Sequence, residues 1–230
     1  MTCILAIDTT LGACSAALIK DENLLACKRE VRARGHVERL LPMIDEVCVA
    51  SGVKVAELDQ IAVTIGPGTF AGVRIGLSAA KGMGLALDIP IIAITTLEVL
   101  AYQYARECID FSGNVAIAID ARRGEVYLQL FEIEKGTCSV ISQPKAVSVQ
   151  SIKDIIGDHI SLIIGSACEL LKELNIDCVQ GYKCPEAEYV AKMAVELSQR
   201  AVVSDDVSPL YLRAPDAVKP APLKMIVRDE

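Results

Sequence analysis

The chain of 230 residues contains no tryptophan, three phenylalanines and two histidines, His36 and His159. Two distant histidines cannot supply a multi-histidine metal site, and so few aromatic rings disfavour a base-stacking surface for nucleic acids. Aspartate and glutamate outnumber lysine and arginine by 30 to 23, which gives a net charge of −7 and predicts poor binding of RNA or DNA by the isolated chain. The one basic cluster, at 28–39, is typical of a charged strand edge; an acidic partner, or RNA held by another subunit, is the alternative.

Long apolar runs and paired cysteines are also missing. The strongest apolar run, 89–94, is short and contains Pro90, so no membrane helix is predicted. The N-terminus reaches Asp8 without the basic start of a signal peptide, and the nine cysteines include no Cys-x-x-Cys pair. An odd number of cysteines scattered through apolar segments is typical of reduced thiols, which predicts a cytoplasmic protein.

The apolar segments of the first half change between strand-like and helix-like spacing. Their order, β-β-β-α-β-α-β-α, is typical of an α/β sheet with an antiparallel meander at one side. We expect strands at 3–8, 13–19, 24–31, 61–65 and 89–95, and helices at 37–50, 70–87 and 96–106.

The second half repeats the beginning of the first. The sequence Ala-Ile-Asp, with a glycine four positions after the aspartate, occurs at 6–12 and again at 118–124, each time at the end of an apolar segment. Two further strand-like segments follow in both places, so we interpret the chain as a duplicated domain. The predicted units are residues 1–110, a smaller unit at 111–203, and a proline-rich arm at 204–230. In the second unit we expect helices near 148–156, 167–174 and 186–200, and strands that include 138–143 and 161–164.

Asp8, Thr9 and Thr10 open the first predicted hairpin. In nucleotide-binding folds of this organisation, the hairpin at this place contacts phosphate and metal. Asp8 is therefore a candidate to hold a metal-bound water, and the hydroxyls of Thr9 and Thr10 are candidates to donate hydrogen bonds to phosphate. An aspartate that simply begins a turn is the commoner explanation. The corresponding second hairpin, Asp120–Glu125, holds two arginines and a glutamate, which could bind a phosphate or a carboxylate but are too bulky for an ordinary ATP cradle.

Glycines mark two predicted junctions between a strand and a helix. Gly66–Gly72 either lets backbone amides approach an anion at a helix N-terminus or permits tight packing. Its spacing matches neither a Walker A loop nor a dinucleotide-binding fingerprint. Gly165 begins the corresponding turn of the second half and is a weak candidate for a contact with adenosine.

Two predicted helices carry more small or apolar residues than contact with one sheet requires. The helix at 70–87 has a small residue at every fourth position, and the helix at 37–50 has a second apolar stripe beside its first. We therefore expect a partner interface made of Leu40, Met43, Val47, Ala50, Gly72, Gly76, Ala80 and Gly84. The alternatives are small residues packed on the chain's own sheet and an unusually buried first helix.

Several of these segments together resemble the TsaB family, bacterial proteins of tRNA threonylcarbamoyladenosine biosynthesis. The resemblance rests on ILAIDTT, GHVERLLPMID, GPGTFAGVRIG, AIDARRGEVY and PLYLR, which run in order over residues 3–213. One departure is Thr69-Phe70-Ala71, where the family usually has Ser-Phe-Thr.

The resemblance implies an α/β fold of duplicated ribonuclease-H-like domains, as in actin, Hsp70 and sugar kinases, with mixed sheets and flanking helices. It also implies a non-catalytic subunit that binds a TsaD-like transferase and a TsaE-like ATPase and reaches tRNA only through the complex. Without that partner, the flat apolar interface expected above could pair with itself as a two-fold homodimer. ATP, ADP and metal would belong to the partners, because Leu40 stands where the TsaD metal motif would place a second histidine after His36. No catalytic residue, cofactor or metal site is therefore expected in this chain. Two other functions stay open: an ATP-dependent small-molecule kinase, favoured by Asp8, and, with less support, a peptidase.

Overall fold

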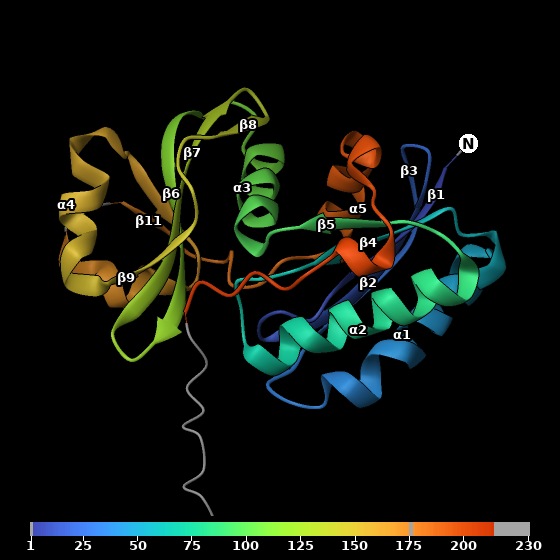
Figure 1. Ribbon diagram of the computed structural model, residues 1–230. Helices are drawn as coiled ribbons and strands as arrows, with labels where there is room; N and C mark the ends of the chain where they lie inside the picture. Colours follow the sequence, from blue (N-terminus) through green and yellow to red (C-terminus); the bar gives the residue numbers. More distant parts are fainter. Residues whose placement is uncertain (1, 175–176, 214–230) are drawn as a thin grey trace, which may run out of the picture.

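The computed structural model of the protein describes residues 2–174 and 177–213, which form two mixed β-sheets standing side by side (Figure 1). The first sheet has the strand order β3-β2-β1-β4-β5. Its strands are β1 (Cys3–Asp8), β2 (Ala13–Lys20), β3 (Asn23–Val31), β4 (Gln60–Thr64) and β5 (Ile91–Ile94). The second sheet has the order β11-β10-β6-β7-β8, with β9 paired to β7. Its strands are β6 (Ser112–Arg122), β7 (Glu125–Glu134), β8 (Thr137–Val140), β9 (Lys145–Ser148), β10 (Leu162–Ile164) and β11 (Cys178–Val179).

The two sheets repeat one topology. In the first, β1, β2 and β3 form an antiparallel meander, and β4 and β5 run parallel to β1 on its other side. In the second, β6, β7 and β8 form the meander, and β10 and β11 run parallel to β6. This repetition, strand for strand, confirms the predicted duplicated ribonuclease-H-like fold.

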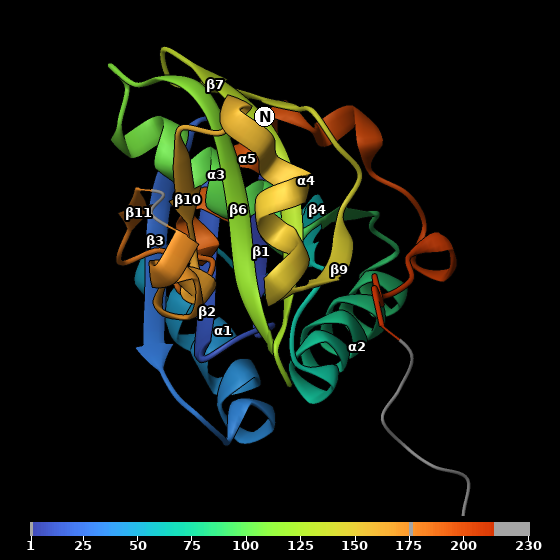
Figure 2. The same cartoon turned by 90° about the vertical axis from the view of Figure 1, so that its left-hand side faces the viewer.

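Helices cover the sheets in alternating layers (Figures 1 and 2). The α-helices are α1 (His36–Ser51), α2 (Phe70–Leu87), α3 (Thr96–Glu107), α4 (Ile152–Ile156) and α5 (Ala187–Glu196). Helices α1 and α2 pack on the outer face of the first sheet, and α5 packs on its inner face. Helix α3 packs between α5 and the second sheet, whose outer face is covered by α4 and the 3₁₀ helix η4 (Ser166–Leu174). We call the first sheet with α1, α2 and α5 the first lobe, and the second sheet with α3, α4 and η4 the second lobe.

Local sequence signals set the ends of the long helices. Thr69 caps α2 by accepting a hydrogen bond from the amide of Gly72, and Thr95 and Glu98 form a capping box at the start of α3. Gly52 ends α1 in the left-handed conformation, at φ 71°. These ends agree with the helices expected from the sequence to within about one residue, which is the usual precision of a helix boundary.

The second lobe departs more from the sequence-based expectation. The helix expected at 167–174 is the 3₁₀ helix η4, and the one expected at 148–156 divides into a 3₁₀ turn and the short α4. Strands β9 and β11 were not anticipated. Each is short, with four and two residues, so local propensity carries little signal for it.

Packing also crosses the predicted boundary between the two units. All strands of the first sheet precede residue 95 and all strands of the second follow residue 111, yet α5, from the second half of the chain, packs on the first sheet. Ala187, Val190 and Ala191 share one core with Ile4 and Ile19. The part of the predicted arm that the structure describes, 204–213, runs from the core of the first lobe at Val207 to the second hairpin at Arg213, and the remainder lies outside the described residues.

Candidate functional site

Asp8 lies at the carboxyl end of β1 and is completely buried. Its Oδ1 atom accepts hydrogen bonds from the hydroxyls of Thr10 and Thr64, both at 2.6 Å, and from the Thr10 amide at 3.2 Å. Burial raises the pKa of this carboxyl above its ordinary value, although the hydrogen bonds oppose the rise. The carboxyl therefore joins the first hairpin to β4 inside the fold.

The two neighbouring candidates for phosphate binding are buried as well. Thr9 donates its hydroxyl to the carbonyl of Gly72 at 2.6 Å, and the Thr10 hydroxyl is used by Asp8. None of these three side chains lines either of the two cavities described below. They hold the hairpin against α2, which is the structural role that the sequence left as the alternative.

Two buried polar atoms near this hairpin lack a hydrogen-bond partner in the described structure. They are Asp8 Oδ2 and His36 Nε2. The positive charge of His36 in its protonated form favours ionisation of Asp8 and lowers its pKa slightly, against the larger effect of burial. No group of three or more His, Cys, Asp or Glu residues in 2–174 and 177–213 is arranged to hold a metal ion.

The glycine turn packs directly on the first hairpin. A Cβ atom added to Gly68 would lie 2.4 Å from the carbonyl oxygen of Thr10, and one added to Gly72 would lie 2.2 Å from that of Thr9. The Thr69 amide donates to the Thr10 carbonyl at 2.8 Å. Glycine is therefore required here because two backbone segments touch, which is the tight-packing role that the sequence left open.

Gly165 has the same role in the second lobe. A Cβ atom on it would lie 2.3 Å from the carbonyl oxygen of Ala118 in β6, and its φ is 126°. The residue permits a tight turn after β10, so the suggested contact with adenosine gains no support from the packing.

Seven of the eight residues assigned to a partner interface are buried inside the chain, which contradicts that assignment. In α2, a Cβ atom on Gly76 would meet the Thr9 hydroxyl at 2.8 Å, and one on Gly84 would meet the Ile89 carbonyl at 3.2 Å. Gly72, Gly76, Ala80 and Gly84 therefore face the chain's own hairpin and sheet. This is the packing alternative that the sequence had left open.

The assignment for α1 fails because this helix is buried over a wide arc. Leu40, Met43 and Val47 belong to the core that α1 shares with the first sheet, together with Ile44 and Cys48 of the other stripe. Of the four residues assigned to a partner on α1, Ala50 alone is exposed. The second stripe thus completes the core.

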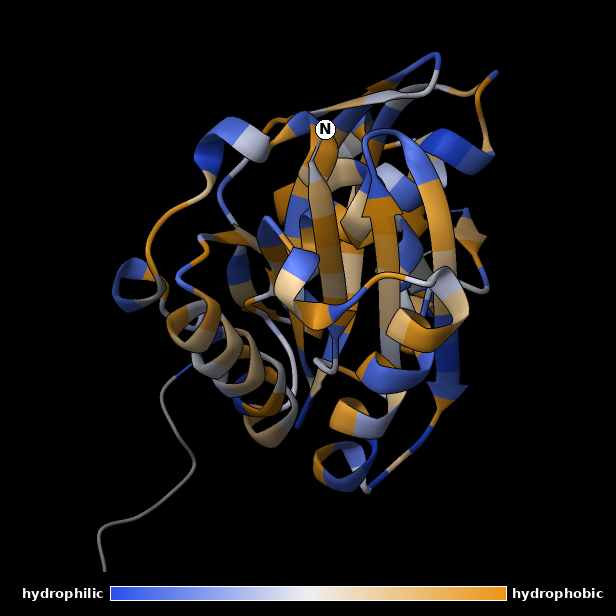
Figure 3. Cartoon of the chain, turned by 90° about the vertical axis from the view of Figure 1, so that its right-hand side faces the viewer, coloured by the Kyte–Doolittle hydropathy of each residue, from blue (hydrophilic) through white to orange (hydrophobic). Residues whose placement is uncertain are grey.

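A different face of α1 and α2 is open to solvent. We call it the outer face, and define it by exposed residues of both helices: Val37, Leu41, Val49, Ala71, Ser78, Gly82, Leu85 and Ala86. Leu41 is 56% exposed and Leu85 79% exposed, and a Cβ atom on Gly82 would meet no atom within 4 Å. Helix α2 carries two charged residues, Arg74 and Lys81, and shows few hydrophilic positions along its length in Figure 3.

A cavity of about 910 Å³ lies between the lobes at the mouths of the two hairpins. The turn of the first hairpin, the start of α1, the glycine turn, the second hairpin and the end of the described chain line it. Charges of both signs reach it, including Arg34, Glu38, Asp120 and Arg122. We call this cavity the interlobe cleft.

The second hairpin closes one side of the interlobe cleft. Arg122, Arg123 and Gly124 all adopt positive φ, at 63°, 57° and 75°, and the Arg122 amide donates to Asp120 Oδ1 at 2.7 Å. Arg213 donates to the carbonyl of Ala121 at 3.2 Å and to the Glu125 carboxylate at 3.0 Å. Sequence reasoning identified the bulk of this hairpin but missed Arg213, because an arm of irregular structure carries no periodic signal.

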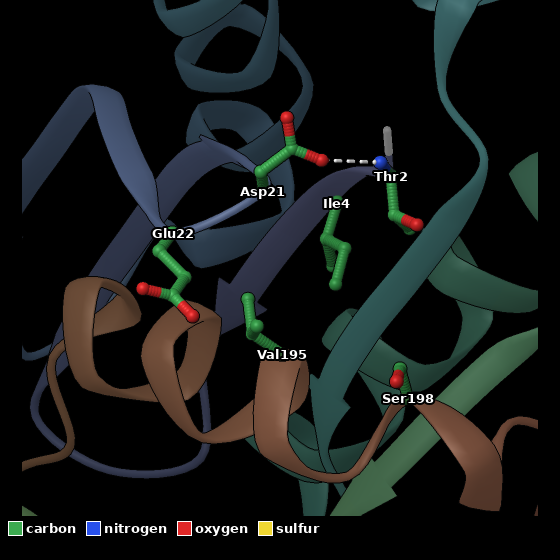
Figure 4. Close-up of a pocket in the computed structure, with 6 residues that line it drawn as sticks. All are labelled: Thr2, Ile4, Asp21, Glu22, Val195 and Ser198. Carbon is green, nitrogen blue, oxygen red and sulfur yellow. Dashed lines mark hydrogen bonds between the residues drawn. The ribbon is translucent and has the colours of Figure 1, made fainter.

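A second cavity, of about 230 Å³, lies at the amino end of β1 (Figure 4). Thr2, Asp21, Glu22 and Ser198 are among its lining residues, and the Thr2 amide donates to Asp21 Oδ1 at 2.9 Å. Ligands of open α/β sheets bind at the carboxyl ends of the parallel strands, which is the opposite end of β1. The interlobe cleft is therefore the better placed of the two cavities for a ligand.

The basic cluster at 28–39 is largely neutralised by carboxylates. Arg39 donates to Glu30 and Glu46, each at 2.7 Å at its shortest, and Lys28 also pairs with Glu46. Arg32 pairs with Glu30 at 3.1 Å, and Arg29 with Glu186 at 3.7 Å. These pairs join β3 to α1 and α5, so the cluster has a structural explanation as a paired strand edge.

No helix within the described ranges is long and apolar enough to cross a membrane.

Comparisons with known proteins agree with the resemblance seen in the sequence. A family model described as TsaD, tRNA N6-adenosine threonylcarbamoyltransferase, matches residues 29–160. The tRNA threonylcarbamoyladenosine biosynthesis protein TsaB of Haemophilus influenzae is 33% identical over 223 residues, covering 91% of this chain and 93% of that protein. TsaB of Escherichia coli is 31% identical over 96% of this chain and 99% of that protein.

A solved structure shows the same arrangement of elements. YeaZ from Pseudomonas aeruginosa superposes with a TM-score of 0.82 at 29% sequence identity, covering 92% of this chain and 100% of that chain. The chain has two sheets of repeated topology, and its TsaB relatives are 31–33% identical along nearly its full length. The chain therefore belongs to the TsaB family.

Proposed function

We propose that this protein is a non-catalytic subunit in the synthesis of N6-threonylcarbamoyladenosine in tRNA. It binds a TsaD-like transferase, acts together with a TsaE-like ATPase, and meets tRNA through that complex. The observation that carries the proposal is the outer face of α1 and α2, whose apolar and small side chains are exposed within residues 2–174 and 177–213, beside exposed charges such as Glu38 and Arg74. Nine free thiols fit a reducing cytoplasm, where tRNA modification takes place.

The first hairpin favours the function of a non-catalytic subunit over that of a kinase. A kinase of this fold needs an aspartate and small hydroxyls open to the nucleotide, whereas Asp8, Thr9 and Thr10 are buried and make hydrogen bonds within the chain. The protein is therefore expected to bind Mg-ATP weakly or not at all. Calorimetry with the isolated chain tests this, and a micromolar or tighter dissociation constant would favour the kinase alternative.

The outer face also explains a glycine that the fold itself does not require. Gly82 lies in the middle of α2 with no atom within 4 Å of an added Cβ, although glycine costs roughly 1 kcal/mol relative to alanine in a helix. Ala71, Ser78 and Ala86 are also exposed, so the same side of the helix carries short side chains. A partner helix can approach such a surface closely, and exposed Leu41 and Leu85 supply apolar contact area.

Gly82→Leu tests the interface directly. The added side chain points to solvent, so the melting temperature should stay at or above that of the wild type, while affinity for the TsaD-like partner should fall at least about tenfold. Gln150→Leu, an exposed neutral position of the second lobe, is the matched control and should bind normally. Co-purification and a threonylcarbamoyladenosine assay, with each subunit omitted in turn, supply the readouts.

The same variant addresses self-association. A flat apolar face can be self-complementary, so the free protein is expected to form a two-fold homodimer through the outer face. Sedimentation should show Gly82→Leu as a monomer and Gln150→Leu as wild type. Normal partner binding and normal modification with Gly82→Leu would overturn the interface assignment.

A further inference from the structure

The described end of the chain runs from the first lobe to the second. Val202 forms a two-hydrogen-bond bridge with Ile91 of β5, at 2.7 and 2.9 Å, and Val207 is buried in the core beneath α2. The Leu210 amide then donates to the carbonyl of Ile65, at the end of β4, at 2.8 Å. In Figure 1 this red segment crosses between the lobes and reaches the base of β6.

Tyr211 fastens the segment to the first turn of α2. Its ring stacks on Phe70 with centroids 5.5 Å apart and an angle of 25° between the planes. Arg74 donates to the Tyr211 hydroxyl at 2.9 Å, and its guanidinium lies 3.5 Å from the centroid of the Phe70 ring. Three side chains from two distant parts of the sequence thus form one stack, which stabilises the segment through π and cation–π contacts.

Two residues further on, Arg213 contacts the second lobe. Its guanidinium donates to the Ala121 carbonyl at 3.2 Å and to Glu125 at 3.0 Å, on either side of the second hairpin's turn. Both Tyr211 and Arg213 line the interlobe cleft. Two positions of one short segment, Tyr211 and Arg213, therefore contact one wall of the cleft and then the other.

We propose that residues 207–213 form a latch that holds the interlobe cleft closed. Opening the cleft requires Arg213 to leave the second hairpin or Tyr211 to leave the stack on α2. The ion pair is partly exposed, with 25% and 37% of the two side chains accessible, so release is reversible and sensitive to salt. Because the stack rests on α2, the latch links the start of that helix to the second hairpin without passing through either sheet.

Hydrogen exchange on the full-length chain, without any partner, tests the latch. In Arg213→Ala, amides of residues 120–126 should exchange about fivefold faster, the factor expected when one exposed ion pair is lost. Arg32→Ala is the matched control: its ion pair with Glu30 has similar exposure, 30% and 33%, and lies wholly within the first lobe. It should leave exchange at 120–126 unchanged.

Tyr211→Ala separates a latch from a local contact. Tyr211 stacks and bonds only with first-lobe residues among the contacts described, so a purely local role predicts no change at 120–126. The latch predicts faster exchange there, together with loss of protection at the Leu210 amide. Tyr211→Phe, which keeps the ring, should have an effect between those of the wild type and Tyr211→Ala and guards against misfolding of the larger truncation. Unchanged exchange at 120–126 in Tyr211→Ala would show a purely local contact and would overturn the proposal, as would unchanged exchange in Arg213→Ala.

Discussion

The two lobes share a strand order but differ in the helices that follow each strand. Between the meander and the next parallel strand, the first lobe has α1 with 16 residues, whereas the second has α4 with five. After that strand, α2 has 18 residues and η4 has nine. Both α1 and α2 bury residues along most of their length against the first sheet, from His36 to Cys48 and from Gly72 to Gly84. Their solvent side is correspondingly longer than that of α4 or η4, and it carries the outer face.

The equivalent aspartates differ in the same way. Asp8 is buried and shared between β1, the first hairpin and β4, whereas Asp120 is exposed at the cleft and bonds the amide of Arg122. The aspartate of the repeated Ala-Ile-Asp sequence is thus buried in the first copy and exposed at the surface in the second. A short motif identifies the place in the topology and leaves the accessibility of its side chains to the packing around it.

Truncation of core residues should have the largest effect and should be alike in the two lobes. Met43→Ala in α1 and Leu171→Ala in η4 each remove a completely buried side chain, so each should lower the free energy of unfolding by about 2–5 kcal/mol. Leu41→Ala on the outer face should change it by less than about 0.5 kcal/mol. Urea denaturation measures all three. A stable Met43→Ala protein that fails to bind the partner would restore the sequence-based interface.

The second comparison lies within α2, between its inner and outer glycines. Gly72→Ala forces a Cβ atom against the Thr9 carbonyl and should cost about 1–3 kcal/mol, although alanine is the better helix former. Gly82→Ala has open space and should gain up to about 1 kcal/mol. Thermal unfolding of the two variants should therefore shift in opposite directions. Equal shifts would mean that the two faces of the helix are wrongly distinguished.

The third prediction uses pH to compare the two aspartates. Because burial raises the pKa of Asp8 above its ordinary 3.8, its contribution to stability is complete below that pH and is lost as pH rises through the folded-state pKa. Asp8→Asn offers an amide oxygen to the same donors and does not titrate, so it should remove this pH dependence and be at least as stable near neutrality. Asp120→Asn makes the same chemical change at the exposed position and controls for the substitution itself. A marked loss of stability in Asp8→Asn at neutral pH would show that the charged carboxylate is needed.

The smallest effect is expected at the paired strand edge of the first lobe. Hydrogen bonds from Arg39 and then Lys28 lower the pKa of Glu46 from 4.5 to about 2. A depressed pKa means that the contribution is present above 4.5 and is lost as pH falls toward 2. Glu46→Gln should therefore destabilise slightly near neutral pH and not at all at the acid end. Urea titrations at both ends check this, and an equal loss at both would point to packing as the cause.

Sequence reasoning located most elements of the first lobe but mistook the direction in which two helices face. In α2 the small residues at 72, 76, 80 and 84 stood out, yet Ala71, Ser78, Gly82 and Ala86 form a second small-sided row on the opposite side. Periodicity shows that such rows exist and cannot say which one meets the sheet. That choice depends on the approach of Thr9 and Thr10 from a distant hairpin, as does the burial of Asp8. The latch could not be predicted from the sequence for a related reason, because the contact partners of Tyr211 and Arg213 lie about 90 to 140 residues away along the chain.

The position of α5 has a consequence for synthesis of the chain on the ribosome. The inner face of the first sheet, which includes Ile4 and Ile19, is covered by a helix that begins at Ala187. At roughly 5–20 residues per second, β5 emerges on the order of ten seconds before α5 can reach it. During that interval the first sheet has its outer helices but an apolar inner face open to water. The nascent N-terminal half therefore exposes an apolar sheet face until α5 is made. The first lobe begins to form early in synthesis but is completed only near its end.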